Sequence, residues 1–324
     1  MRNQSASSVT NRLSKERIAR KKLMRIILSS SPSDLEKSII SEIGIQPTPA
    51  ITKKFANGET YINILDDMQD KYVFIMQTAG NTINDNLMET YLKADACRLM
   101  GARKIVVVMP NFPYARQDRK TETGEPISAK LNIALLQTSG VDSVITIDIH
   151  SAAVRDFGKV INMTELSSLE VIANYFENKG FDKKNLCVVS PDKGGVKRAN
   201  NLATALKCDQ AVIHKERIAH NQAKAETLSG DVKGKICIIY DDMIDTAGTI
   251  SEAAKMTKNH GADKIYIAAS HGLFNGPAIE RLTSAPIEEI VVTNSEKLPD
   301  TSYNKIKQAD MAKDIIKAMF DLSC

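Results

Sequence analysis

The sequence predicts an α/β protein with two similar units, each built on a mainly parallel sheet that is flanked by helices. Short β-branched runs alternate with helical stretches along the chain. The runs 105–109 and 236–240 are apolar at every position, which is typical of parallel strands buried on both faces. The order of strands and helices then starts again in the second half, with a boundary near residues 160–170.

Helix-ending residues help to bound the elements of the first half. Gly101 and Gly140 follow two helical stretches, and glycine readily takes the left-handed conformation beyond a helix end. Pro126 suits the first position of a helix. We expect strands at 25–29, 72–77, 104–109 and 143–147, and helices at 34–43, 85–100 and 126–139.

The second half follows the same order, and Gly261 ends its second helical stretch. Because ligands of open parallel sheets bind beyond the carboxyl ends of the strands, the residues after each strand are the candidates for chemistry. We expect strands at 186–189, 211–214, 235–240, 264–269 and 289–292, and helices at 196–206 and 246–260.

Residues 1–23 differ from the rest, because they are rich in serine and basic residues and carry a single acidic residue, Glu16. They suit a flexible tail, a mitochondrial-type presequence or an artefact of a misplaced start codon, since Met24 opens the first strand. We favour the tail or the artefact. The predicted domains are then a flexible extension at 1–23, an N-terminal domain at 24–165 and a C-terminal domain at 166–324.

Composition excludes several classes of protein. The 324 residues are 43% hydrophobic and 25% charged, with a net charge of +4, which gives no reason to expect nucleic acid as a partner. No apolar run reaches the roughly 18 residues of a membrane span, so we expect no membrane partner. The five cysteines are scattered without a Cys-x-x-Cys pair. We therefore expect a reducing compartment, the cytoplasm, with the mitochondrion as alternative if residues 1–23 are a presequence.

The strongest chemical signal is the segment 238–249, in which a buried strand ends in two adjacent carboxylates, Asp241 and Asp242. The turn that follows runs into a helix, so its backbone N–H groups and the helix N-terminus favour a phosphate. The two carboxylates would repel phosphate and suit sugar hydroxyls or a metal ion. The segment predicts a sugar-phosphate site made of Asp241, Asp242, Asp245, Thr246, Ala247, Gly248 and Thr249.

An alternative is that Asp245 or Thr246 merely caps the helix. A cap needs one such residue, whereas this segment has two carboxylates and a Thr-Ala-Gly-Thr turn. The segment resembles the phosphoribosyl-diphosphate signature of the type I phosphoribosyltransferase fold, which is shared by several enzymes and some non-catalytic regulators.

Further motifs narrow the family. Read in chain order, these are Asn84-Asp-Asn-Leu-Met-Glu89, Pro113-Tyr-Ala-Arg-Gln-Asp-Arg119, Pro126-Ile-Ser-Ala-Lys130, Asp148-Ile-His150, Ser190-Pro-Asp192 with Gly194-Gly195, and His271-Gly-Leu-Phe-Asn-Gly-Pro277. From about residue 24 to about residue 320 the chain resembles the ribose-phosphate pyrophosphokinases. The resemblance implies two phosphoribosyltransferase-like domains and transfer of the β,γ-diphosphoryl group of ATP to O1 of ribose 5-phosphate. The products would be AMP and phosphoribosyl diphosphate for nucleotide biosynthesis.

The resemblance also implies roles for individual residues. Lys215 and Arg217 would be catalytic cations that close over the transferring group, on a mobile flap at 218–228. From the residues alone, a solvated charged loop is the preferred interpretation of this segment. Mg²⁺ would be the cofactor, with His150 and Asp192 as ligands; a lone histidine would more often make a structural hydrogen bond. ATP would bind to Arg116, Gln117 and Asp118 of the N-terminal domain, with Phe55, Asn57, Gly58 and Glu59 supplied by a neighbouring subunit of a homo-oligomer, a hexamer in this family.

The chain departs from the family where regulatory phosphate and ADP would bind. Gln69 and the pair Thr123-Gly124 stand where basic residues are common, and 153–158 replaces a glutamine-rich stretch. The family's C-terminal Ser-x-Ser tail is missing before Cys324. Because charge-assisted contacts contribute about 1.5–3 kcal/mol each, we expect weak phosphate activation and weak ADP inhibition.

Two other functions compete with this prediction. A catalytically silent homologue should lack the cations or metal ligands, yet Lys215, Arg217, His150, Asp192 and Arg116 are all present. An ordinary phosphoribosyltransferase that acts on a nucleobase or orotate would lack the loop 113–119 and the duplicated domain. The formation of AMP from ATP and ribose 5-phosphate separates the three.

Overall fold

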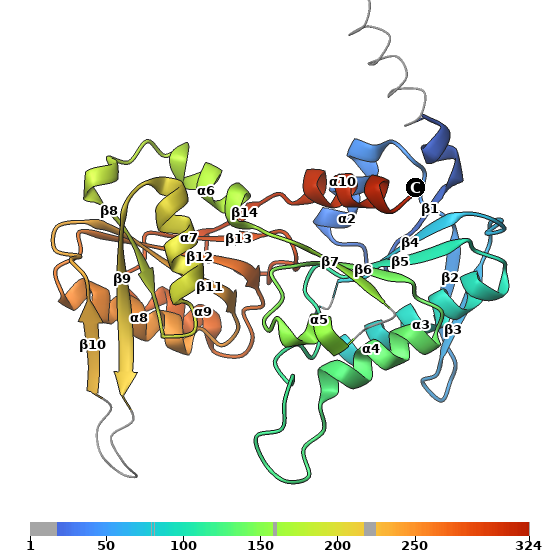
Figure 1. Ribbon diagram of the computed structural model, residues 1–324, viewed down its shortest axis with the longest axis horizontal. Coiled ribbons are helices and arrows are strands. Elements are labelled where there is room, and N and C mark those ends of the chain that lie inside the picture. Colours follow the sequence, from blue (N-terminus) through green and yellow to red (C-terminus); the bar gives the residue numbers. More distant parts are fainter. Residues whose placement is uncertain (1–17, 79, 81, 158–160, 217–224, 324) are drawn as a thin grey trace, which may run out of the picture. The chain divides into compact units, whose positions relative to one another are not determined.

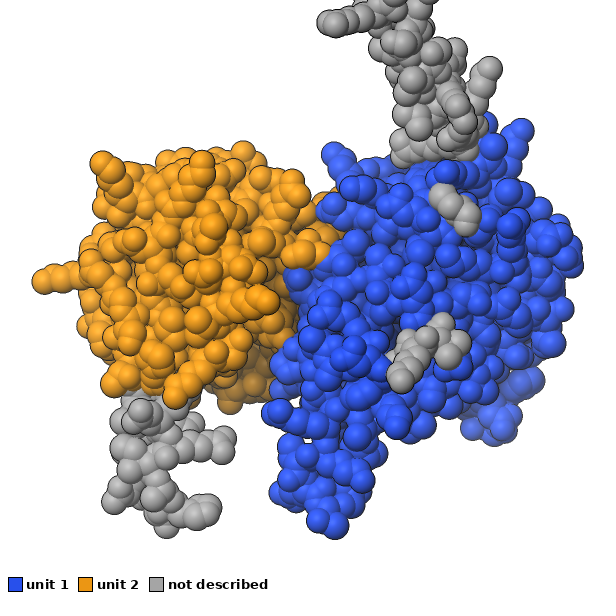
Figure 2. Space-filling view, in the orientation of Figure 1, with its two compact units in different colours: residues 1–166, 312–324 blue, residues 167–311 orange. Residues whose placement is uncertain are grey.

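The computed structural model describes residues 18–78, 80, 82–157, 161–216 and 225–323 (Figure 1). The chain divides into two compact units, which Figure 2 shows in different colours. Unit 1 contains residues 1–166 and 312–324, and unit 2 contains residues 167–311. Within the described ranges, no helix combines the length and the apolar composition that a membrane crossing requires.

Unit 1 is built on a parallel sheet with the strand order β1-β4-β5-β6-β7, beside a separate hairpin of β2 and β3. Helices α3 and α4 lie on one side of the sheet, and α2 and α10 lie on the other (Figure 1). The strands are β1 (Met24–Ile27), β2 (Ala50–Lys54), β3 (Thr60–Ile64), β4 (Tyr72–Met76), β5 (Lys104–Val108), β6 (Ser143–Ile147) and β7 (Asn162–Leu166). The helices are α2 (Asp34–Ile43), α3 (Ile83–Leu99), α4 (Ser128–Thr138), α5 (Ala153–Phe157) and α10 (Ala312–Leu322).

Unit 2 is built on a sheet with the order β10-β9-β8-β11-β12-β13-β14, in which only the edge strand β10 is antiparallel to its neighbour. Apolar residues of α8 and α9 pack on one face, and those of α6 and α7 pack on the other. The strands are β8 (Leu186–Ser190), β9 (Asp209–Glu216), β10 (Ala225–Ser229), β11 (Ile236–Ile244), β12 (Lys264–Gly272), β13 (Glu289–Thr293) and β14 (Ile306–Ala309). The helices are α6 (Leu169–Glu177), the short 3₁₀ helix η1 (Lys183–Asn185), α7 (Val196–Leu206), α8 (Gly248–Asn259) and α9 (Ala278–Thr283).

The two units repeat one arrangement, which confirms the predicted fold class. Each begins its sheet with a strand and a helix, continues through a hairpin, and then adds parallel strands that alternate with helices. Buried runs explain why the sheets are covered on both faces: Ile105, Val106, Val107 and Val108 are all fully buried. Local signals fix some helix ends. Ser33 and Glu36 form a capping box at the start of α2, and Gly44 ends it with φ at 65°.

Several element boundaries differ from the prediction. Helix α4 begins at Ser128 rather than at Pro126, with Ile127 as its N-cap residue. Strand β11 continues through both aspartates to Ile244, and β12 continues through His271 to Gly272. These extensions pair with each other, so the ladder between neighbouring strands overrides the polar composition. Residues 218–224 of the predicted flap lie outside the described residues, and residues 225–229 form β10 against β9.

The C-terminal helix α10 belongs to unit 1, although the prediction placed the whole of 166–324 in one domain. The helix is amphipathic and buries Ile315 and Met319 completely. Lys104 Nζ donates to the carbonyl oxygen of Leu322 at 3.0 Å, which ties the end of α10 to β5. The apolar face shows that α10 packs against a domain, but chain order does not show which of the two domains provides the surface.

The described cysteines Cys97, Cys187, Cys208 and Cys237 are free thiols. Cys187 and Cys237 lie opposite each other in register on β8 and β11, and both are fully buried. Their mutual hydrogen bond and their burial raise the pKa of the Cys187 thiol. The thiol therefore stays protonated and packs as a small apolar group.

Candidate active site

The predicted phosphate turn lies between β11 and α8 in unit 2. Ala247 has φ at 58°, so the chain turns sharply before α8 begins at Gly248. The first intrahelical bond runs from Ser251 N–H to the Ala247 carbonyl oxygen at 3.0 Å, and the N–H groups before it point out of the helix start. Together with the helix dipole, these N–H groups suit a phosphate.

Asp245 and Thr246 do not cap α8, because its N-cap residue is Ala247 and no side chain caps the helix. Asp245 Oδ1 instead accepts a hydrogen bond from Asn275 Nδ2 at 2.9 Å. The Thr246 carbonyl oxygen accepts one from Arg281 Nη1 at 2.9 Å. The turn is therefore fixed from the side by the segment that follows β12, and the capping alternative is wrong.

The two adjacent aspartates share one cation. Arg198, in the first turn of α7, places Nη1 3.2 Å from Asp241 Oδ1 and Nη2 3.7 Å from Asp242 Oδ2. Burial and the neighbouring Asp242 carboxylate raise the pKa of Asp241 to about 7, and Arg198 opposes that rise. Asp241 can therefore change its charge near neutral pH, which is common at functional sites.

Asp192 lies after β8, the strand next to β11 in the sheet. The chain leaves β8 for β9 on one side and returns as β11 on the other, so the loops after β8 and β11 diverge at a topological switch point. Asp192 Oδ1 accepts the N–H of Gly195 at 2.9 Å, and Ser190 Oγ donates to the Asp192 carbonyl oxygen. A Cβ atom at Gly195 would lie 2.9 Å from Ser190 Oγ, so a larger residue there would force the Ser190 hydroxyl to move.

Unit 1 contains a cavity of about 440 Å³ that brings together Arg116, Gln117, Asp118 and His150. Two hydrogen bonds of 2.5 Å fix this arrangement. Ser151 Oγ donates to Asp118 Oδ2, and Ser128 Oγ donates to Gln117 Oε1. The cavity therefore joins the loop after β5 to the loop after β6, as expected at the carboxyl edge of a parallel sheet.

Phe55, Asn57, Gly58 and Glu59 form the turn of the β2–β3 hairpin. Phe55 N–H donates to the Glu59 carbonyl oxygen at 2.8 Å, and Asn57 Oδ1 accepts the Glu59 N–H at 3.2 Å. The Phe55 side chain is 54% exposed. An exposed aromatic ring at the tip of an ordered hairpin is available to a ligand or to another chain.

The two predicted catalytic cations are described to different extents. The backbone of Lys215 lies in β9, opposite Glu226 of β10. Arg217 lies outside the described residues. Strand pairing thus fixes the chain at Lys215, two residues before Arg217.

The predicted metal ligands belong to different units, His150 to unit 1 and Asp192 to unit 2. Among the residues that the structure describes, no three His, Cys, Asp or Glu side chains gather as a metal-binding group. Mg²⁺ commonly takes only one or two protein ligands and completes its octahedron with waters and substrate phosphates. Each unit thus supplies one of the two predicted ligands, and the hydrogen bond from the Gly195 N–H orients the Asp192 carboxylate.

Sequence reasoning missed Arg198, Asn275 and Ser151. Arg198 follows the Gly194-Gly195 pair by three residues, so a cation in the first turn of the next helix was a usable signal. Asn275 lies in the quoted motif 271–277, which indicated a family without assigning a role to each position. Ser151 had no signal, because its partner Asp118 lies 33 positions away in the chain.

Two similar α/β units, each built on a mainly parallel sheet, together with a strand–turn–helix segment at 238–249 of the second, define a protein of the phosphoribosyltransferase-like class. Family models match both halves: residues 24–140 match the N-terminal domain of ribose phosphate pyrophosphokinase, and residues 219–321 match a phosphoribosyl synthetase-associated domain. The chain belongs to the ribose-phosphate pyrophosphokinase family, which is a family of transferases.

Individual relatives are similar over nearly their whole length. The ribose-phosphate pyrophosphokinase of Listeria ivanovii is 40% identical over 290 residues, covering 89% of this chain and 91% of the relative. That of Fusobacterium nucleatum is 41% identical over 285 residues, covering 88% and 90%. The crystal structure of phosphoribosylpyrophosphate synthetase from Mycobacterium smegmatis has a TM-score of 0.84 at 31% identity and covers 92% of this chain and 98% of its own.

Proposed function

We propose that the chain transfers the β,γ-diphosphoryl group of ATP to O1 of ribose 5-phosphate, with ATP in unit 1 and the sugar phosphate in unit 2. The observation that carries this proposal is the turn before α8, where free N–H groups stand beside a pair of aspartates held by one arginine. Phosphate suits the N–H groups, and ribose hydroxyls suit the carboxylates.

In unit 2, the 5-phosphate would accept hydrogen bonds from the first N–H groups of α8 and from the hydroxyls of Thr246 and Thr249. Asp241 and Asp242 would accept hydrogen bonds from the ribose hydroxyls, which orients O1 for attack on the β-phosphorus of ATP. Arg198 keeps the two carboxylates in place and favours the ionised form of Asp241. Such orientation is a main contribution of the protein to phosphoryl-transfer chemistry.

In unit 1, Arg116, Gln117 and Asp118 would bind ATP in the 440 Å³ cavity. Phe55 would stack on the adenine of a neighbouring subunit, with Asn57, Gly58 and Glu59 beside it; this requires a homo-oligomer, a hexamer by resemblance. Mg²⁺ would neutralise phosphate charge when bound. His150 and Asp192 would hold it together with phosphate oxygens and waters.

Lys215 and Arg217 would supply positive charge to the transferring group. Positive charge stabilises the transition state most when water is excluded. The strand position of Lys215 supports a cation carried at the base of a short segment between β9 and β10. We also propose a cytoplasmic location, because the described cysteines are free thiols, as is usual in a reducing compartment.

The reaction is tested by incubating the purified chain with ATP, Mg²⁺ and ribose 5-phosphate. AMP and phosphoribosyl diphosphate should form in equal amounts, and AMP should not form without ribose 5-phosphate. A chain that binds nucleotide without forming AMP would be the catalytically silent homologue. An ordinary phosphoribosyltransferase would instead release diphosphate from phosphoribosyl diphosphate only when a nucleobase is added.

The raised pKa of Asp241 predicts a pH dependence. Its carboxyl is ionised above about pH 7 and protonated below it, so kcat/KM for ribose 5-phosphate should fall as the pH drops through 7, toward tenfold per pH unit. Arg198→Met removes a cation that lowers this pKa, so the fall should move to higher pH. The measurement is kcat/KM between pH 5.5 and 9 at saturating ATP.

The substrate phosphate also titrates, at about pH 6, and Asp241→Asn is the matched control. In this variant the substrate phosphate still titrates, but the fall in kcat/KM near pH 7 should be lost. If kcat/KM of Asp241→Asn falls near pH 7 as in the wild type, the fall comes from another group.

We also propose that orthophosphate activates this chain weakly and that ADP inhibits it weakly. Arg155, in the stretch that departs from the family, already pairs with Glu165 at 2.8 Å, which reduces its attraction for an added anion. Activity should change less than about twofold between phosphate-free buffer and millimolar phosphate. A strict need for phosphate would contradict the proposal.

A further inference from the structure

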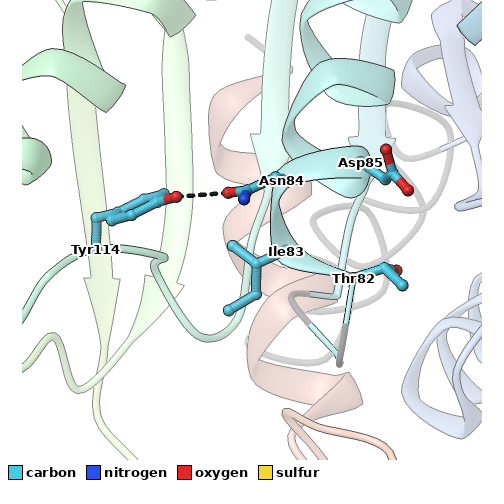
Figure 3. Close-up of a pocket in the computed structure, with 5 residues that line it drawn as sticks. All are labelled: Thr82, Ile83, Asn84, Asp85 and Tyr114. Carbon is cyan, nitrogen blue, oxygen red and sulfur yellow. Dashed lines mark hydrogen bonds between the residues drawn. The ribbon is translucent and has the colours of Figure 1, made fainter. Parts of the chain in front are cut away.

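The loop 113–119, which leads from β5 toward α4, lines two cavities. Residues 116–119 line the cavity assigned to ATP. Tyr114 lines a second cavity of about 520 Å³, whose other walls are Thr82, Ile83, Asn84 and Asp85 at the start of α3 (Figure 3). One short loop therefore connects the ATP cavity with a helix to which no role has been assigned.

The conformation of the loop depends on Tyr114. Its φ is 64°, a left-handed value that bulky residues rarely adopt. The Tyr114 carbonyl oxygen accepts the N–H of Gln117 at 2.9 Å, which closes the turn containing Arg116. Because the strained residue sets the direction of this turn, an outside contact that holds Tyr114 also holds Arg116 and Gln117.

Asn84 supplies that contact. The Tyr114 hydroxyl donates to Asn84 Oδ1 at 2.5 Å, and the two side chains point toward each other across the cavity (Figure 3). Asn84 lies in the first turn of α3, which is fixed in the core of unit 1 by buried Leu87 and Ala94. The acceptor is therefore attached to a rigid element, whereas the donor is attached to a loop.

We propose that Asn84 is a positioning residue for nucleotide binding, acting through Tyr114 to hold Arg116 and Gln117 toward the ATP cavity. The role gives a function to the motif 84–89. It rests on the proposed function, because it takes the 440 Å³ cavity as the ATP site. A merely structural hydrogen bond would alter thermal stability and leave ATP affinity unchanged.

The test measures ATP binding by calorimetry with Mg²⁺ and without ribose 5-phosphate. Asn84→Ala and Tyr114→Phe each remove one partner of the bond and should raise the Kd for ATP by about threefold to tenfold. The double variant should bind no more weakly than either single variant, because one shared bond is lost. The KM for ribose 5-phosphate should stay unchanged.

Thr82→Ala is the matched control, because Thr82 lines the same cavity but its hydroxyl donates to Asn86 Oδ1 of α3 at 3.2 Å and not to the loop 113–119. Its Kd should equal that of the wild type. Wild-type ATP affinity in Asn84→Ala and Tyr114→Phe would overturn the inference. It would also be overturned if the increase in Kd in the double variant equalled the product of the increases in the two single variants. A wild-type chain that does not bind ATP would remove the proposed function as well, which distinguishes the two failures.

Discussion

Replacing Lys93 with methionine should lower the free energy of unfolding by about 3–5 kcal/mol, because it leaves a buried carboxylate without its cation. Lys93 and Glu89 form an ion pair on α3, and their side chains are only 1% and 5% exposed. Lys93 Nζ also donates to the Leu28 carbonyl oxygen at 2.7 Å. The variant therefore takes the paired cation from Glu89 and one donor from the Leu28 carbonyl oxygen in unit 1.

The same carboxylate fixes the loop after β1. Glu89 Oε1 accepts the N–H of Ser30 at 3.0 Å, and Glu89 Oε2 accepts the Ser30 hydroxyl at 2.7 Å. In Lys93→Met, the charge would have only these neutral donors, which compensate a buried carboxylate poorly. Chemical denaturation followed by circular dichroism measures the loss of stability.

Adding Glu89→Gln to Lys93→Met should recover part of the lost stability, because the amide oxygen still accepts from Ser30 and carries no charge. Lys37→Met is the exposed control: Lys37 pairs with Asp34 at the surface, with 66% and 81% of the side chains exposed, and such pairs contribute little. Equal stability losses in Lys93→Met and Lys37→Met would show that the buried pair does not matter.

Lys215→Ala should reduce turnover by about 10²- to 10³-fold, the size of effect seen when one preorganised transition-state donor is removed. ATP affinity should change much less, because ATP is assigned to the unit 1 cavity. The measurements are kcat from AMP formation and the Kd for ATP by calorimetry.

Lys184→Ala is the control for the loss of one positive charge from unit 2, because Lys184 is an exposed residue of the short helix η1. It should retain wild-type turnover. Turnover near the wild-type value in Lys215→Ala would show that the residue is not a catalytic cation.

Much of the fold follows from local signals in the sequence. The predicted helices 34–43 and 196–206 match α2 and α7, and the predicted strand 143–147 matches β6. Caps and apolar periodicity define such elements within their own residues. Pairing between strands is not local: β10 and the extended ends of β11 and β12 form because a neighbouring strand supplies hydrogen bonds.

The candidate site likewise has a part that local sequence predicts and a part that depends on distant residues. The aspartate pair and the turn before α8 are contiguous, so their residues could be predicted together. Arg198 meets Asp241 from 43 positions away, and Asn84 meets Tyr114 from 30 positions away. These contacts depend on how helices pack around the sheets, and one sequence without that packing does not identify them.

The most direct test of the central claim is a crystal structure of the chain with ribose 5-phosphate. The phosphate should lie against the first N–H groups of α8, beside Thr246 and Thr249, with the ribose hydroxyls at Asp241 and Asp242. Ribose 5-phosphate bound at another place, with the turn before α8 empty, would contradict the account.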